Sequence, residues 1–98
     1  MTYFFRFAGT SVEDLQALKN TPHLEKRYKA VIKALRFLKQ NPRHPGLQTH
    51  ANSSMTGPVG EKVFEAYAEQ NTPAAYRIFF YYGKTEGEIV IAAITPHP

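Results

Sequence analysis

Arg77 is a charged residue inside a strongly apolar and aromatic segment of the chain, residues 75–82. A guanidinium in such a setting is costly to bury unless an acceptor lies beside it. Glu65, in the preceding apolar segment, is the carboxylate that could supply this acceptor. The pair allows two interpretations: a guanidinium that binds phosphate with a carboxylate beside it, or a structural ion pair on the solvent face of a sheet.

Two of the four histidines are candidates for proton transfer. His50 lies in a segment rich in turn residues, and His97 lies between two prolines after the last apolar segment. Imidazole titrates near neutral pH, so each could act as a general acid or base. The alternative is that both are inert, because loop and terminal histidines are usually solvated. Without cysteine or a His-x-x-x-His spacing the metal signal is weak, so we expect neither a metal nor another cofactor.

The composition is that of an ordinary globular domain and excludes several classes of protein. The 98 residues are 43% hydrophobic and 20% charged, and none is cysteine, which excludes disulfides and thiolate chemistry. No run approaches the roughly 20 apolar residues of a membrane helix, and the first residues lack the pattern of a signal peptide. We therefore expect one soluble, cytoplasmic domain over residues 1–98, with no membrane partner.

The clearest periodic pattern predicts an amphipathic helix over residues 24–40, ended by Asn41-Pro42. Its apolar residues form a stripe that faces a core, although Phe37 falls outside the stripe. Four cations lie together on the opposite side: Lys26, Lys29, Lys33 and Arg36. Basic residues are concentrated in the first 42 positions, which favours a polyanionic partner such as nucleic acid or an acidic protein. A solvated helix face that only keeps the protein soluble is the alternative.

The other elements that we expect are strands over residues 1–7, 62–69, 75–82 and 88–95, a short helix from Ser11 to about Asn20, and a long connection over residues 41–60. The order is one strand, a helical hairpin and a three-stranded antiparallel meander. It predicts an α+β domain with one sheet packed on its helices. On this sheet Arg77 lies in the middle strand of the meander, and Glu65 lies in the strand before it.

Taken in order, four segments resemble the RelE/ParE toxin superfamily of type II toxin–antitoxin systems. They are Ala34 to Pro42 at the end of the long helix, Gly46 to His50 with Gly57 after it, Tyr76 to Phe80, and Ile89 to His97. The resemblance covers nearly the whole chain, and it rests on the order of the segments because no single one is specific. It implies a RelE-like fold and a cognate antitoxin protein as the partner.

Within this superfamily the chain is most similar to the YoeB-like and YafQ-like ribonuclease branches. The resemblance implies a metal-independent endoribonuclease that cleaves mRNA on the ribosome and arrests translation. It also implies roles for single residues. Arg77 would stabilise the scissile phosphate, His97 would be the acid, and His50 or Glu65 would be the base. A base, an acid and a cation are the groups that cleavage through the RNA's own 2′-hydroxyl needs.

RNA contact is expected at five exposed cations, namely Lys26, Lys29, Lys33, Arg36 and Lys62. The sequence departs from the ribonuclease pattern at Pro98, where many members carry an aromatic residue, and it has few lysines around Lys62. Two alternatives stay open: a ParE-like inhibitor of DNA gyrase without nuclease activity, and a degenerate, non-toxic member that only binds an antitoxin. Gyrase-directed members lack the histidines, so His50 and His97 favour the nuclease.

Overall fold

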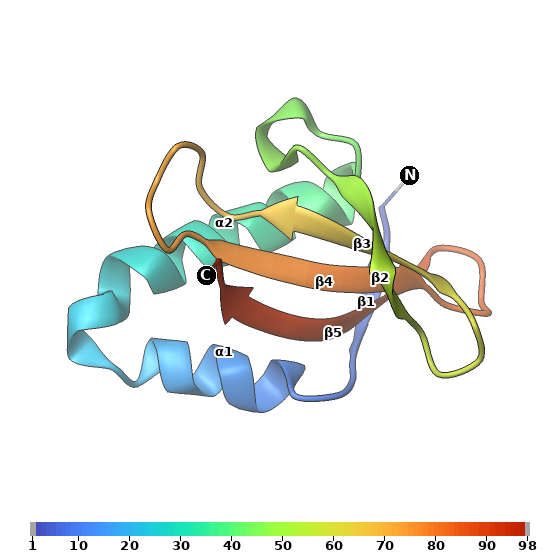
Figure 1. Ribbon diagram of the computed structural model, residues 1–98, viewed down its shortest axis with the longest axis horizontal. Helices are drawn as coiled ribbons and strands as arrows, with labels where there is room; N and C mark the ends of the chain where they lie inside the picture. The colour runs from blue at the N-terminus through green and yellow to red at the C-terminus, as the bar shows by residue number, and fades with distance from the viewer. Residues whose placement is uncertain (1, 98) are drawn as a thin grey trace.

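The computed structural model describes residues 2–97 of the chain (Figure 1). Met1 and Pro98 lie outside this part, and so does the departure from the ribonuclease pattern at Pro98. The helices and strands follow one another as β1 (Phe4–Phe7), α1 (Ser11–Lys19), α2 (Glu25–Gln40), β2 (His50–Thr56), β3 (Lys62–Tyr67), β4 (Tyr76–Tyr82) and β5 (Glu88–Pro96). Single turns of 3₁₀ helix occur at Pro22–Leu24 and Pro45–Leu47.

The strands form one mixed sheet in the order β1-β5-β4-β3-β2. β1 runs parallel to β5, and the other neighbouring strands are antiparallel. The expected α+β class, with two helices and one sheet, is confirmed. The expected three-stranded meander is wrong in detail, because an additional strand, β2, precedes it and forms one edge of the sheet.

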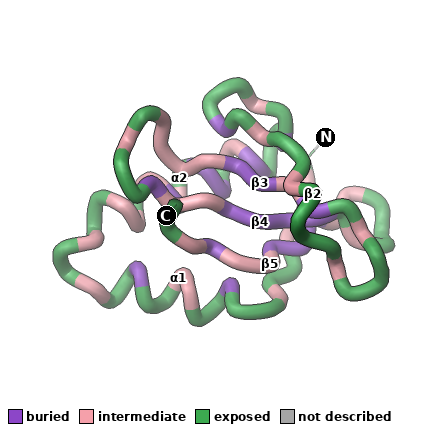
Figure 2. The backbone as a smooth tube through the Cα atoms, viewed as in Figure 1, coloured by how far each residue is buried: buried purple, intermediate pink, exposed green. Residues whose placement is uncertain are grey.

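β2 lies within residues 41–60, which the sequence predicts as a connection. It is an irregular edge strand that pairs with β3 at His50, Ala51 and Thr56, with a shift in register between the last two. Its residues are mostly exposed (Figure 2), so no alternation of apolar and polar residues marks it in the sequence. β2 is therefore held by its backbone pairing with β3 and by a few polar side chains rather than by an apolar face.

α2 covers one face of the sheet, and α1 packs beside β5 on the same side (Figure 1). The apolar stripe of α2 is buried as predicted, through Val31, Ala34, Leu35 and Leu38. These residues share a core cluster with sheet residues of β3, β4 and β5, including Ala66, Ile78, Phe80, Ile89 and Ile91. Phe37, outside the stripe, is half-buried and stacks on the His44 ring with centroids 4.1 Å apart. No helix of residues 2–97 has the length and apolar character that crossing a membrane requires.

The face of the sheet that points away from α2, which we call the open face, carries a smaller apolar cluster. Alternation along β4 sends Ile78 and Phe80 to the core and Phe79 and Tyr81 to the open face. Val63 of β3 and Val90 of β5 join this second cluster. β4 is therefore buried on both sides, as its sequence predicts, and its odd-numbered residues, Arg77 among them, lie on the open face.

β5 contains a bulge beside the loop that leaves β1. Phe79 pairs with Ala93 and Phe80 pairs with Ile91, so Ala92 is an extra residue in β5. Gly9 approaches the bulge with a backbone φ of +56°, and a Cβ placed on it would lie 2.6 Å from the Ala92 carbonyl oxygen. The close approach and the positive φ both require glycine at this position.

Candidate active site

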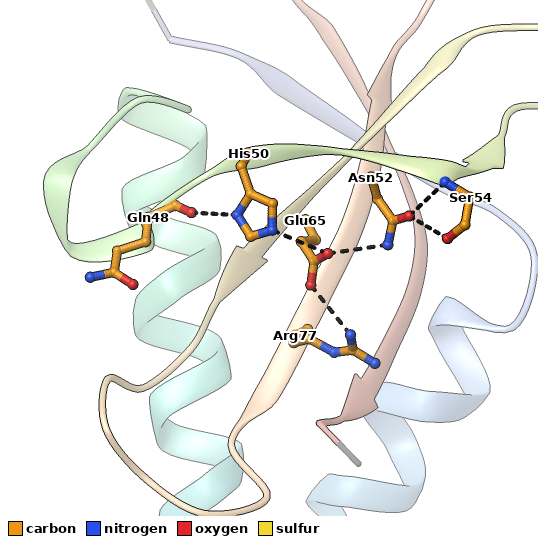
Figure 3. Close-up of polar contacts among 6 residues, drawn as sticks. All are labelled: Gln48, His50, Asn52, Ser54, Glu65 and Arg77. Atoms are coloured by element: carbon orange, nitrogen blue, oxygen red, sulfur yellow. Dashed lines mark hydrogen bonds and ion pairs between the residues drawn. The ribbon is translucent and has the colours of Figure 1, made fainter.

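A carboxylate at the centre of the open face contacts three side chains from two neighbouring strands (Figure 3). Glu65 itself is 6% exposed. His50 Nε2 lies 3.3 Å from its Oε1 atom, and Asn52 Nδ2 donates to the same oxygen at 3.1 Å. Arg77 Nη1 donates to Oε2 at 3.3 Å. Both oxygens of the buried carboxylate thus have polar partners, which offsets the cost of burying its charge.

The register of the edge strand β2 against β3 brings these groups together. His50 is the residue of β2 that lies directly opposite Glu65 of β3. Asn52 follows two residues later, and its Oδ1 atom accepts hydrogen bonds from the Ser54 main-chain N–H at 3.0 Å and from the Ser54 hydroxyl at 2.6 Å. This turn-like arrangement orients the amide so that its NH₂ group faces Glu65. The irregular strand is therefore anchored at the site.

The His50 ring is placed between two oxygen atoms. Nδ1 lies 3.0 Å from the Gln48 carbonyl oxygen, and Nε2 faces the Glu65 carboxylate. A ring that carries its proton on Nδ1 donates to Gln48, and Nε2 then has a lone pair that can take a proton. Once both nitrogens are protonated, Nε2 donates to Glu65. The His50 side chain is 49% exposed and that of Glu65 is 8% exposed. His50 is thus the member of this pair that an external molecule can reach.

Arg77 is held by a carboxylate on one side and an aromatic ring on the other. Its guanidinium carbon lies 4.8 Å from the centroid of the Phe79 ring, a distance that suits a cation–π contact. Its side chain is 18% exposed. Among the described residues the Nε atom is buried and has no hydrogen-bond partner. A buried donor without a partner is costly, and the guanidinium thus has hydrogen-bonding capacity that Glu65 does not use.

His97 lies on the same face, beyond the end of β5. Its main-chain N–H donates to the Ala75 carbonyl at 2.8 Å, which fixes the segment against the start of β4. The His97 ring lies 6.2 Å from the ring of Tyr67, which in turn lies 5.7 Å from the ring of His50. Tyr67 thus stands between the two histidines.

The structure brings the four predicted proton-transfer and phosphate-binding residues to one face. His50, Glu65 and Arg77 are in contact, and His97 joins them through the Tyr67 ring. Sequence reasoning missed Asn52 and Tyr67. The sequence pattern could have identified Tyr67, because it lies two residues after Glu65 and therefore shares its face of the strand. No pattern identifies Asn52, because it lies in the segment predicted as a connection.

The predicted RNA-binding cations are not part of this cluster. The four on α2, namely Lys26, Lys29, Lys33 and Arg36, are exposed as predicted, but the sheet separates their helix from the open face. Lys29 forms an ion pair with Glu25 at 3.1 Å. Lys62, at the start of β3, has its ammonium 5.8 Å from the Phe64 ring, which packs against the helix-side core. Residues 2–97 contain no group of three or more His, Asp or Glu side chains placed to hold a metal ion.

Comparisons with known proteins show the fold. No family model and no curated protein matches the sequence. The chain is similar in structure to one in the archaeal RelE–RelB complex from Pyrococcus horikoshii OT3, with a TM-score of 0.62, 18% identity, and coverage of 98% of this chain and 96% of that one. It is also similar to one in the toxin–antitoxin complex RelBE2 from Mycobacterium tuberculosis, with a TM-score of 0.58, 19% identity, and coverage of 99% and 100%.

Proposed function

Since the chain has the fold of RelE toxins, we propose that it is the toxin of a type II toxin–antitoxin pair and that it cleaves mRNA on the ribosome. The observation that supports this proposal best is the contact of His50, Glu65 and Arg77 on the open face, with His97 beside them. These are the residue types that a ribonuclease acting through the 2′-hydroxyl uses.

In the proposed reaction His50 takes the proton of the ribose 2′-hydroxyl, because it is exposed while Glu65 is buried. Glu65 orients the ring and balances the charge that the ring acquires. The 2′-oxygen attacks the adjacent phosphorus, and the bond from phosphorus to the 5′-oxygen breaks. His97 gives a proton to that oxygen, so the products are a 2′,3′-cyclic phosphate and a free 5′-hydroxyl.

Arg77 is proposed to bind the phosphate while negative charge grows on its non-bridging oxygens. Its planar guanidinium presents several N–H groups in a fixed arrangement, and contact with Glu65 uses only Nη1. The Phe79 ring and the Glu65 carboxylate hold it in place before RNA arrives. Such preorganised charge is usually the largest contribution to catalysis of this kind.

The partners in this proposal are an antitoxin protein, mRNA and the ribosome, in the cytoplasm. The similar chains come from a RelE–RelB complex and from a toxin–antitoxin complex, which supports a protein partner of this kind. The exposed cations of α2 are proposed to contact ribosomal RNA, because they form a basic surface away from the cleavage site. No cofactor is needed if the three side chains supply base, acid and cation.

The test is a cell-free translation reaction with a defined mRNA, with cleavage mapped by primer extension. We expect ribosome-dependent cuts with the wild type and none with Arg77→Ala or His97→Ala. His23→Ala, which removes an exposed histidine between α1 and α2, and Lys84→Ala, in the turn after β4, are the matched controls. Circular dichroism must show that all variants are folded.

Intact mRNA with the folded wild type would reject the nuclease proposal. A DNA supercoiling assay would then separate the two alternatives: inhibition of gyrase would identify a ParE-like protein, and its absence would leave a member that only binds an antitoxin. Cuts that persist in both variants would show a nuclease whose groups lie elsewhere.

A further inference from the structure

A hollow of about 370 Å³ opens beside His97, between the loop that joins β3 to β4 and the segment before β2. Its lining includes Gln48, Tyr67, Gln70, Asn71, Thr72 and His97. Its volume is at the lower end of the range of roughly 300–1,000 Å³ that is typical of small-molecule sites. It therefore has room for a small planar group next to the proposed cleavage site.

The lining offers several hydrogen-bonding side chains but almost no charge that is available to a ligand. It contains three carboxamides, from Gln48, Gln70 and Asn71, and no lysine or arginine. Its one carboxylate, Glu69, is already bound to Arg27 by two hydrogen bonds of 2.9 and 3.1 Å. A phosphate would find no guanidinium or ammonium there. A neutral group with donors and acceptors along one edge would find carboxamides that offer both.

One wall of the hollow is aromatic. The Tyr67 ring stands at the end nearest His50, and Pro73 contributes a second apolar surface. Unstacked bases of single-stranded RNA are recognised by stacking on such rings and by hydrogen bonds to their edges. Carboxamides are suited to reading base edges because donor and acceptor lie side by side.

The loop is fixed in a conformation that presents these groups. Gln70 Nε2 donates to the Gly46 carbonyl at 2.7 Å, and the Thr72 hydroxyl donates to the Gln70 carbonyl at 3.0 Å. Gln48 and Asn71 both have positive φ, 47° and 52°. Non-glycine residues at positive φ are uncommon and concentrate at functional sites. Here both residues line the same hollow.

From these observations we propose that the hollow binds one unstacked nucleobase of the RNA, adjacent to the phosphate that is cut. Gln48 and Asn71 read the edge of the base, and Tyr67 stacks on its face. This inference rests on the proposed nuclease function. The hollow sets which positions of the RNA the enzyme prefers to cleave. Arg77 takes part in cleavage at every position and does not select the base.

The direct test is an NMR titration of the ¹⁵N-labelled protein with the four nucleoside 5′-monophosphates, and with ribose 5-phosphate as a probe that lacks a base. The side-chain NH₂ signals of Gln48 and Asn71 report on the hollow. We expect the nucleotides to shift these signals, ribose 5-phosphate to leave them unchanged, and one nucleotide to bind about fivefold or more tightly than the weakest. Asn71→Ala should reduce this preference to less than about twofold.

Asn20→Ala is the matched control, because Asn20 is an exposed asparagine at the end of α1, outside the hollow. The inference is overturned if the nucleotides leave both NH₂ signals unchanged, or if ribose 5-phosphate shifts them equally. In the primer-extension assay Asn71→Ala should reduce cleavage at the positions that the wild type prefers and so change the pattern of cuts, whereas Arg77→Ala should remove cuts at every position.

The two proposals fail in different ways. If the wild type and Asn71→Ala cleave at the same positions and with the same frequencies, the inference is overturned and the nuclease proposal stays intact. Base-dependent shifts in the hollow, with no cleavage by the wild type, would overturn the nuclease proposal and support a site for nucleobases in a protein of another activity.

Discussion

Arg77 reaches Glu65 along a diagonal of the sheet. The register pairs Arg77 with Tyr67 and Glu65 with Phe79, yet Nη1 of the arginine lies 3.3 Å from Oε2 of the carboxylate. Diagonal neighbours on adjacent strands are within reach of long side chains. The guanidinium also lies over the Phe79 ring, so the carboxylate and the ring together fix the position of the cation.

Replacing Glu65 by glutamine should destabilise the fold. The change removes the only anion that contacts Arg77 and His50 among the described residues. It also replaces one of the two acceptor oxygens by an NH₂ donor. We expect the free energy of unfolding to fall by about 1–3 kcal/mol, measured by urea denaturation. Glu86→Gln, at an exposed turn position, is the control and should change it by less than about 0.5 kcal/mol. Equal effects of the two variants would contradict a structural role of this carboxylate.

His97→Ala should separate activity from stability. The segment is held by its main-chain N–H bond to Ala75, which the substitution keeps, and the side chain is exposed. The free energy of unfolding should therefore change by less than about 0.5 kcal/mol, while the rate of mRNA cleavage falls by about 10²–10⁴-fold, as expected when a general acid is removed. A single-turnover cleavage assay beside a urea titration checks both parts. A large fall in stability would show instead that the ring is structural.

Gly9→Ala should destabilise the protein more than Gly60→Ala. Both glycines have positive φ, +56° and +90°, so both substitutions strain the backbone. Only the Cβ at residue 9 would also meet a carbonyl oxygen, that of Ala92, whereas nothing lies within 4 Å of a Cβ at residue 60. We expect the free energy of unfolding to fall by about 1–3 kcal/mol at residue 9 and by less at residue 60, from thermal unfolding of the two variants. Similar changes would mean that the bulge yields to the added methyl group.

The basic face of α2 should control affinity for the ribosome rather than the cleavage step. We expect Lys33→Ala with Arg36→Ala to weaken ribosome binding and to reduce its salt dependence, with a change in slope of about 0.7–0.9 for each phosphate that the variant no longer neutralises. Cosedimentation at several salt concentrations measures this. Lys19→Ala, on α1, is the control. An unchanged slope would show that these cations form only a solvated helix face. That is the alternative interpretation of the basic residues in the sequence.

Tyr82 should ionise at higher pH than a free tyrosine. Burial raises its pKa above the ordinary value of 10.0, the nearby Tyr3 raises it further, and Arg43 acts in the opposite direction. Because the folded state holds this proton more tightly than the unfolded state, its contribution to stability is complete below about pH 10 and is lost as the pH rises through the folded pKa. Ultraviolet titration of tyrosine ionisation should show a component above pH 10 that is absent from Tyr82→Phe. The prediction is wrong if the component that this substitution removes titrates at or below pH 10.

The sequence predicts those parts of the fold that burial makes periodic. α2 is found because its apolar stripe recurs at helical spacing, and β4 is found because both of its faces are covered. β2 is not found, because its residues, His-Ala-Asn-Ser-Ser-Met-Thr, include several with low strand propensity and lie at an exposed edge. Nor does any pattern in residues 4–7 show that β1 pairs with β5 and runs parallel to it.

In the candidate site, too, some residues can be placed from the sequence and others cannot. Glu65 and Arg77 are predicted to meet because alternation along two neighbouring strands places them on one face. Asn52 is brought to Glu65 by the irregular strand β2, so its position depends on a register that local sequence does not determine. The hollow beside His97 depends on the positive φ values of Gln48 and Asn71, which these residue types do not by themselves predict.

The parallel pairing of β1 with β5 has a consequence for how the protein is made. Arg6 and Glu88, which form an ion pair at this junction, are 82 positions apart. The first strand therefore has no partner until β5 has been synthesised, and Phe5, which packs against the core of the folded protein, has no cover on the nascent chain until then. Contacts between such distant residues slow folding and prolong the exposure of apolar segments.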